Sequence, residues 1–183
     1  MAQQLHSFTR HGIYRKYFDG PNSLDYKNNL VVLELDHLKG KKHLQQVVLL
    51  QLIAQLNNEF YLGDRRVPKI LLVDEAWEAF EDPMVAKFLE GAFRRMRKAA
   101  AAPVVVTQSL RDLYNSASGE AIANNAANVI VLRQNGEAIE ALKESGRFNI
   151  GDYGYEMLKS LHTEPGQYSE VLFRSGTAWG VGR

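Results

Sequence analysis

The chain has 183 residues, of which 45% are apolar and 23% are charged, and this length and composition fit one folded domain with a sizeable core. The 22 Lys and Arg residues nearly balance the 21 Asp and Glu residues, so the formal net charge of +1 predicts no general attraction to nucleic acid or to an anionic membrane. Cysteine is absent, which excludes a disulfide scaffold, a thiolate metal site and a cysteine nucleophile.

The first half of the chain predicts a strand, a helix and a second strand. Residues 1–29 mix aromatic and charged side chains around a turn, so we expect them to be loosely structured or to lead into an interface. The segment LVVLEL at residues 30–35 predicts a strand. Apolar residues then recur every four positions from Leu44 to Leu56, which predicts a helix that ends near Gly63. ILLV at residues 70–73 predicts a strand buried on both faces, as in a parallel sheet.

The second half continues this alternation. Asp82 and Pro83 form a typical helix start, and we expect Pro103 to end that helix. Further along we expect a strand at residues 104–106, a helix at 120–127, a strand at 129–132, and an antiparallel hairpin of residues 167–174 and 177–181. The order predicts an α/β fold with a mainly parallel sheet flanked by helices and a C-terminal antiparallel hairpin.

Two acidic residues directly follow the strand at residues 70–73. Four apolar residues and then Asp74 and Glu75 fit the Walker B pattern of nucleoside triphosphatases. In that pattern the aspartate holds Mg²⁺, usually through water, and the glutamate orients the attacking water. The alternative is that both acids begin a surface turn or cap the next helix.

The next predicted strand also ends in polar residues, Thr107 and Gln108. A right-handed crossover between the two strands would bring Gln108 near Glu75, where an amide can sense a γ-phosphate or position a water. The alternative is a solvated loop glutamine. We assign Trp77, just beyond the acids, to packing.

Several familiar catalytic motifs are absent from the sequence. The only Gly-Lys pair, Gly40-Lys41, is followed by Lys42, so no GxxxxGKS or GxxxxGKT phosphate loop is present. A GxGxxG dinucleotide fingerprint and an HExxH metal motif are also missing, and Ser109 lacks the GxSxG context of a hydrolase nucleophile.

A basic run closes the predicted helix after Pro83, and its members are Arg94, Arg95, Arg97 and Lys98. The run fits a solvated helix end, where cations interact favourably with the helix dipole. It also fits an interface at which Arg94 or Arg97 reaches a neighbour's nucleotide as a trans finger, and Arg133 is a second candidate for that role. Contact with nucleic acid is the weakest interpretation, because the net charge is close to zero.

Several segments together resemble the C-terminal ATPase region of the TraC-like conjugation and type IV secretion ATPases, which are RecA-like P-loop NTPases related to the FtsK/HerA group. The resemblance runs in order over nearly the whole chain, through FDGPNSLDYKNNLVVLELDHLKGKKHLQQVVLLQL, LLVDEAWEAFEDP, FRRMRKAAAAPVVVTQSL, FNIGDYGYEMLKSL and PGQYSEVLFRSG. It implies that Asp74 is the Walker B acid that binds Mg²⁺, that Glu75 is the catalytic glutamate, and that Gln108 is the sensor, with Thr107 beside the nucleotide.

The resemblance also implies ATP and Mg²⁺ as cofactors and a hexameric motor that powers pilus assembly and secretion. Its partners would be copies of itself, other secretion-channel proteins and the channel base at the inner membrane, on the cytoplasmic side. Arg97 would be a trans arginine finger. In such proteins the phosphate loop lies upstream, so we expect residues 1–183 to be the C-terminal part of one ATPase domain and to be inactive alone. A non-catalytic docking module and a DNA translocase are the alternatives.

Overall fold

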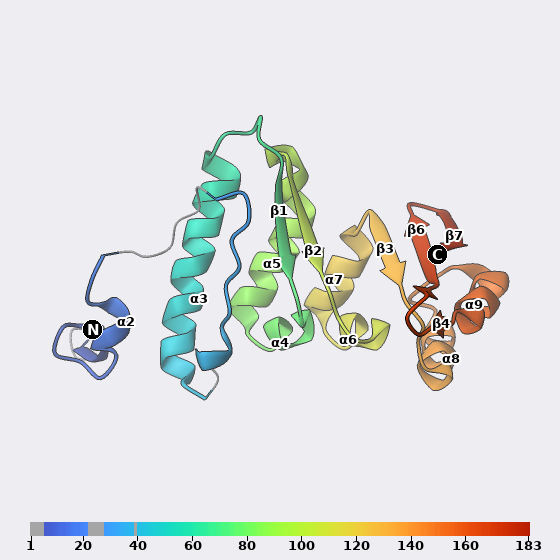
Figure 1. Ribbon diagram of the computed structural model, residues 1–183, viewed down its shortest axis with the longest axis horizontal. Helices are drawn as coiled ribbons and strands as arrows, with labels where there is room; N and C mark the ends of the chain where they lie inside the picture. Colours follow the sequence, from blue (N-terminus) through green and yellow to red (C-terminus); the bar gives the residue numbers. More distant parts are fainter. Residues whose placement is uncertain (1–5, 22–27, 39) are drawn as a thin grey trace. The chain divides into compact units, whose positions relative to one another are not determined.

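The computed structural model describes residues 6–21, 28–38 and 40–183. Packing divides the chain into two units, Met1–Leu52 and Ile53–Arg183, and the division falls inside the long helix α3 (Lys42–Asn57). Figure 1 follows the chain from blue at the N-terminus to red at the C-terminus. The single domain expected over residues 1–183 stays a prediction. Among the described residues, no helix combines the length and the apolar character needed to cross a membrane.

The first unit holds short helical elements and the start of α3. The short turns η1 (His6–Phe8) and α2 (Arg15–Phe18) are joined by aromatic packing, because the Phe8 ring stacks on Tyr14 with 5.3 Å between centroids and meets the edge of Phe18 at 5.5 Å. A further turn, η2 (Asp36–Leu38), precedes α3.

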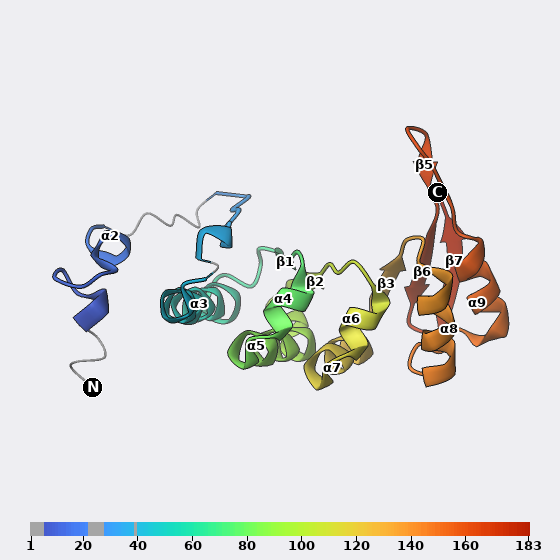
Figure 2. The same cartoon turned by 90° about the horizontal axis from the view of Figure 1, so that it is seen from below.

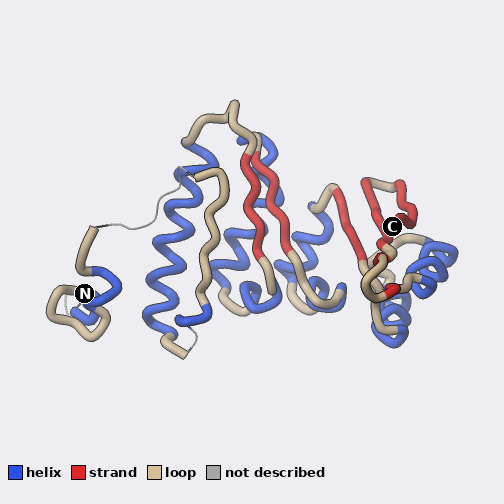
Figure 3. The backbone as a smooth tube through the Cα atoms, viewed as in Figure 1, coloured by secondary structure: helices blue, strands red, loops and turns tan. Residues whose placement is uncertain are grey.

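The strand expected at residues 30–35 is wrong. The structure assigns no strand there, and Figure 3 draws the stretch as loop. Leu30 is 79% exposed and Val32 is 72% exposed. β-branched composition predicts a strand only where a neighbour accepts its hydrogen bonds, and within the described residues this stretch has no ladder partner.

The predicted helix that follows is confirmed. α3 continues into one turn of π-helix, η3 (Asn58–Leu62), and the chain leaves it at Gly63, whose N–H donates to the Asn58 carbonyl at 3.1 Å. Phe60 in this turn is buried with Ala92, Met96 and Ala101, which belong to elements further along the chain. This cluster is the first of two cores in the second unit.

A parallel pair of strands carries the candidate site. β1 (Lys69–Val73) pairs with β2 (Ala101–Val105) in register from Lys69↔Ala101 to Val73↔Val105. The crossover between them contains α4 (Ala76–Phe80), α5 (Pro83–Arg95) and the short η4 (Met96–Ala99). α5 starts as predicted, because the Asp82 side chain accepts hydrogen bonds from the N–H groups of Met84 at 2.8 Å and Val85 at 3.3 Å.

Within the second unit, whose residues are all described, helices cover one face of this pair. Figure 2 shows α4 and α5 on the same side of β1 and β2, and Leu71 packs into the first core. On the other face Ile70 is 72% exposed and Leu72 is 59% exposed. The continuous apolar run predicted that the strand is buried on both faces. This prediction is wrong for the described residues, because α4 and α5 both pack on the same face of β1.

Pro103 does not end the preceding helix. η4 ends at Ala99, Ala100 turns the chain with φ of 54°, and Pro103 lies inside β2. Successive N–H groups of a strand point to opposite sides. The Val106 N–H donates to the Val73 carbonyl at 2.9 Å, so the Pro103 nitrogen, three residues earlier, points away from β1. A proline is tolerated there because β1 needs no donor from that position.

The C-terminal part builds a second sheet and a second core. α6 (Leu110–Tyr114) and α7 (Ala117–Asn125) lead into β3 (Asn128–Val131), which pairs antiparallel with β6 (Val171–Ser175), and β6 pairs antiparallel with β7 (Ala178–Gly182). α8 (Gly136–Ser145) and α9 (Gly151–Ser160) contribute to a core that contains Phe148 and Leu172. A small ladder of β4 (Thr163–Glu164) and β5 (Tyr168–Ser169) precedes β6.

The predicted fold class is confirmed. The structure is an α/β arrangement with a parallel pair, flanking helices and a C-terminal antiparallel hairpin. The helix expected at 120–127 corresponds to α7, and the strand expected at 129–132 corresponds to β3. The hairpin turns at Gly176, whose φ of 59° suits glycine. β3, however, joins the hairpin rather than the parallel pair.

Candidate functional site

The polar residues singled out in the sequence meet at the carboxyl ends of β1 and β2. Asp74 and Glu75 follow β1, and Thr107 and Gln108 follow β2, at the edge where Val73 pairs with Val105. The Gln108 Nε2 atom donates a hydrogen bond to Glu75 Oε1 at 2.9 Å. The proximity that the crossover predicted for Glu75 and Gln108 is therefore confirmed.

Glu75 occupies a left-handed backbone conformation, with φ of 48° and ψ of 44°. Such a conformation costs a residue with a Cβ about 1–2 kcal/mol and persists only where its surroundings fix it. Here the Glu75 N–H donates to Asp74 Oδ1 at 2.9 Å. The next residue, Ala76, is fully buried and its N–H donates to the Val106 carbonyl at 2.9 Å. These bonds tie the turn between β1 and α4 to the neighbouring strand.

Trp77 contacts the same carboxylate. Its indole Nε1 atom donates to Glu75 Oε2 at 2.6 Å, while the residue is 39% exposed. Sequence reasoning assigned Trp77 to packing and missed this bond. The one signal was a tryptophan two residues after the acidic pair, and the left-handed turn that lets the two side chains meet has no mark in the sequence.

Asp74 is exposed at the strand end, and one of its carboxylate oxygens accepts the Glu75 N–H. Within the described part of the chain, no three His, Cys, Asp or Glu side chains come together as a ready metal site. Mg²⁺ bound with a nucleotide needs no such group, because water and phosphate oxygens fill most of its coordination shell. A single exposed carboxylate fits that kind of binding, whereas the phosphate loop is missing from the sequence.

Thr107 uses its hydroxyl within the loop. Its Oγ1 atom donates to the Ser109 carbonyl at 2.9 Å. Ser109 in turn caps α6, because its hydroxyl accepts the Arg111 N–H and its own N–H donates to the Asp112 carboxylate. This bonding holds the loop that presents Gln108. A contact between Thr107 and a nucleotide stays a prediction.

The arginines considered as fingers come from three different elements, and Arg97 lies away from these carboxylates. Arg97 is exposed on η4, which leads into the first residue of β2, whereas Glu75 lies beyond the last residue of β1. Five residues of strand separate the two ends by roughly 16 Å. Arg94 forms an ion pair with Glu90 at 2.8 Å, and Arg133 is exposed after β3. The structure therefore does not join Arg97 to the site of its own chain.

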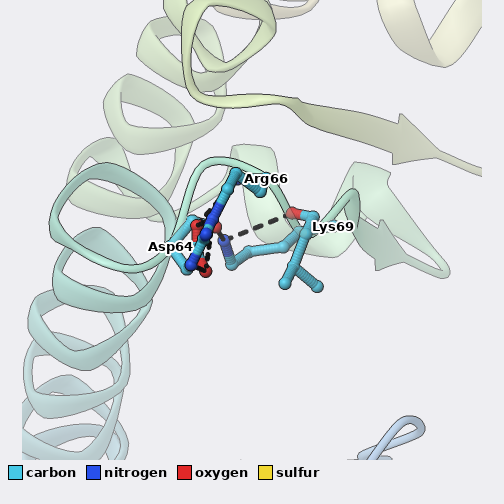
Figure 4. A network of polar contacts seen from close by, with 4 residues as sticks. Asp64, Arg66 and Lys69 are labelled. Atoms are coloured by element: carbon cyan, nitrogen blue, oxygen red, sulfur yellow. Dashed lines mark hydrogen bonds and ion pairs between the residues drawn. The ribbon is translucent and has the colours of Figure 1, made fainter.

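A second polar cluster lies at the opposite end of β1 and is shown in Figure 4. Arg66 Nη2 and Asp64 Oδ2 lie 2.8 Å apart, and Lys69 Nζ donates to the Asp64 carbonyl. The hydrogen bond from Arg66 lowers the pKa of Asp64 below its ordinary value. These contacts brace the loop between η3 and β1, so this cluster serves the start of the strand and not the site at its end.

Comparisons with known proteins find one matching family model and two similar proteins. The family model described as TraG P-loop domain matches residues 1–172. Protein TraC of Escherichia coli (strain K12) is 29% identical over an alignment of 155 residues, which covers 81% of this chain and 17% of TraC. The structure of VirB4 of Thermoanaerobacter pseudethanolicus has the same fold, with a TM-score of 0.66 and 23% identity over 93% of this chain and 45% of that chain. The chain thus spans less than half of either relative.

Proposed function

Because the chain belongs to the TraG P-loop domain family, we propose that it is the part of a conjugation or type IV secretion motor ATPase that acts on the γ-phosphate of ATP. Asp74 is the Walker B acid, Glu75 orients the attacking water, and Gln108 is the sensor. The observation that carries this proposal is the 2.9 Å hydrogen bond from Gln108 to Glu75 across the ends of two parallel strands. The likeness to TraC supports it.

Each residue has a separate task in this proposal. Bound with ATP, Mg²⁺ would neutralise negative charge on the phosphates. Asp74, whose carboxylate is exposed, is the residue that would hold the metal. Glu75 accepts a hydrogen bond from the attacking water and so fixes its direction of approach. Gln108 keeps its hydrogen bond to Glu75 when no γ-phosphate is present. When a γ-phosphate oxygen is in reach, the Gln108 amide donates to that oxygen instead and releases Glu75.

The proposed assembly rests on the resemblance to the TraC-like ATPases and is compatible with the missing phosphate loop and with the exposed position of Arg97. A segment outside residues 1–183 supplies the loop, and copies of the chain form a hexameric ring at the cytoplasmic base of a secretion channel in the inner membrane. Arg97, exposed and at the far end of β2 from Glu75, serves a neighbouring copy, with Arg94 and Arg133 as the other candidates. Contacts with nucleic acid are weak.

Calorimetry and hydrolysis assays test this function. Titration of ATP with Mg²⁺ into the 183-residue chain is expected to give only weak binding and no turnover, because the phosphate loop and its lysine are missing; micromolar affinity would contradict the proposal. Joined to its phosphate loop, the protein is expected to hydrolyse ATP. There Glu75→Gln should keep ATP binding and abolish hydrolysis, while Glu81→Gln, which changes an exposed acid at the end of α4, should leave both unchanged.

A non-catalytic docking module is the second candidate, favoured by the lack of a phosphate loop in the sequence. It predicts that binding to a secretion-channel protein is equally strong for the wild type and for the Glu75→Gln, Gln108→Ala double variant. Hydrolysis that depends on Glu75 in the protein with its loop would exclude this candidate.

A further inference from the structure

Two donors hold the two carboxylate oxygens of Glu75. Trp77 Nε1 donates to Oε2 at 2.6 Å, and Gln108 Nε2 donates to Oε1 at 2.9 Å. We propose that Trp77 is the positioning residue for Glu75: its indole keeps Oε2 in place throughout, and Oε1 is the oxygen that passes from Gln108 to the attacking water. The effect on hydrolysis rests on the proposed function of Glu75, whereas the contact itself does not.

The two donors differ in how firmly they are tied to Glu75. Trp77 is two residues away on α4, whose first residue is anchored to the end of β2 through the bond from Ala76 to Val106. Gln108 is 33 residues away in the chain, in the loop after β2. The anchored turn keeps the backbones of Glu75 and Trp77 together, so only a side-chain rotation parts these two residues, whereas Gln108 also separates from Glu75 when its loop moves relative to β1. The bond to Gln108 is the one that opens.

The chemistry of the two groups points the same way. An indole N–H can only donate, so Trp77 cannot accept a proton or bind a water hydrogen in place of the carboxylate. An amide both donates and accepts, so Gln108 can exchange Glu75 for a phosphate oxygen or a water. The Trp77 indole, which only donates, is therefore suited to holding Glu75 in one position. The Gln108 amide, which donates and accepts, is suited to sensing the phosphate.

Packing alone does not account for the position of Trp77. The residue is 39% exposed and belongs to neither of the two cores found among the described residues. The chain has one other tryptophan, Trp179, which packs against the C-terminal core and lies 5.8 Å from Tyr153 between ring centroids. Trp179 thus serves as a matched control: an indole that packs but has no part in the site.

The contact is tested first by NMR on the 183-residue chain, without nucleotide. Each indole gives one N–H resonance, and Trp179→Phe identifies that of Trp77. We expect Glu75→Ala to move the Trp77 resonance and to speed its exchange with solvent about fivefold to tenfold, as loss of one net hydrogen bond requires. Gln108→Ala should leave this resonance in place, because Gln108 bonds to the other oxygen. An unchanged Trp77 resonance in Glu75→Ala would overturn the proposal.

The positioning role is tested in the protein joined to its phosphate loop. Trp77→Phe keeps an aromatic ring but removes the N–H, and we expect kcat to fall about tenfold while KM for ATP changes less than about twofold. Trp179→Phe should leave both constants unchanged. A Trp77→Phe variant with wild-type kcat would refute the positioning role. If the wild type itself shows no hydrolysis, the proposed function fails, and the NMR result still decides whether the contact exists.

Discussion

Because Glu75 has a left-handed backbone conformation, we predict that glycine at position 75 gives a more stable protein than alanine at the same position. Glu75→Gly and Glu75→Ala both remove the carboxylate together with all its hydrogen bonds, so comparing the two variants isolates the backbone. Alanine keeps the Cβ that makes φ of 48° unfavourable, and glycine does not. We expect the Glu75→Gly variant to be the more stable of the two, against the usual order of these residues.

The size of the difference follows from two opposing terms. Relief of the left-handed conformation favours glycine by about 1–2 kcal/mol. The greater freedom of glycine in the unfolded chain favours alanine by about 0.5–1 kcal/mol. With the middle of each range, the net advantage of glycine is about 0.75 kcal/mol, or about 1.5–3 °C in the melting temperature of a chain this long.

Urea unfolding of the 183-residue chain measures this difference, and two control variants check its cause. Ala100→Gly changes an exposed residue with φ of 54°, outside the site, and should also stabilise the chain. Ala102→Gly makes the same chemical change at an exposed position of β2 and should destabilise it by about 0.5–1 kcal/mol. The reasoning is refuted if Glu75→Ala is as stable as Glu75→Gly, or if Ala100→Gly and Ala102→Gly shift stability in the same direction.

Three further predictions concern stability, solubility and pH. Asp82→Ala removes the acceptor of two N–H groups at the start of α5 and should cost about 1 kcal/mol by thermal unfolding. Changing Ile70 and Leu72, on the uncovered face of β1, to lysine should raise solubility in light-scattering assays and lower stability by less than about 0.5 kcal/mol. Burial raises the pKa of Glu170, but hydrogen bonds and charge from His162 outweigh it, so the pKa of Glu170 lies below its ordinary value. The ionised Glu170 therefore stabilises the folded chain at pH values above the ordinary pKa of a glutamate, and this stabilisation is lost as pH falls through the lowered pKa. Glu170→Gln should make the free energy of unfolding depend less steeply on pH on the acid side.

Each of these predictions has a matched control. Asp82→Asn keeps a capping oxygen and should retain most of the stability. Leu71→Lys changes the neighbour that packs into the first core and should destabilise the chain strongly, in contrast to the outward positions. Glu164→Gln, at an exposed residue of β4, should leave the acid side unchanged; if it matches Glu170→Gln, the assigned origin of the pH dependence is wrong.

The sequence predicted the parts of the site that depend on connectivity. Gln108 lies beside Glu75 because two parallel strands joined by a crossover end at one edge, and this follows from the order of the elements alone. Apolar spacing and a capping pair similarly located α3 and the start of α5. Such features are local in the chain or follow from topology, so they can be seen without coordinates.

Other features depend on contacts that the sequence does not mark. LVVLEL has strand composition, yet a strand also needs a partner, and residues 30–35 have none among the described residues. The bond from Trp77 to Glu75 requires a left-handed residue where glycine would be expected. The continuous apolar run of β1 does not reveal whether helices cover one face of the strand or both, because the run has the same sequence pattern in either arrangement.

Pro103 makes the two outer edges of the parallel pair unequal. On the β2 side its ring replaces an N–H that points away from β1, so a strand added along that edge would meet a gap in the ladder. The β1 side, KILLV, contains no proline and offers an unbroken row of donors and acceptors. A strand added along the β2 edge would therefore form one backbone hydrogen bond fewer than a strand added along the β1 edge. This asymmetry sets the side on which β1 and β2 can extend into a larger sheet without loss of hydrogen bonds.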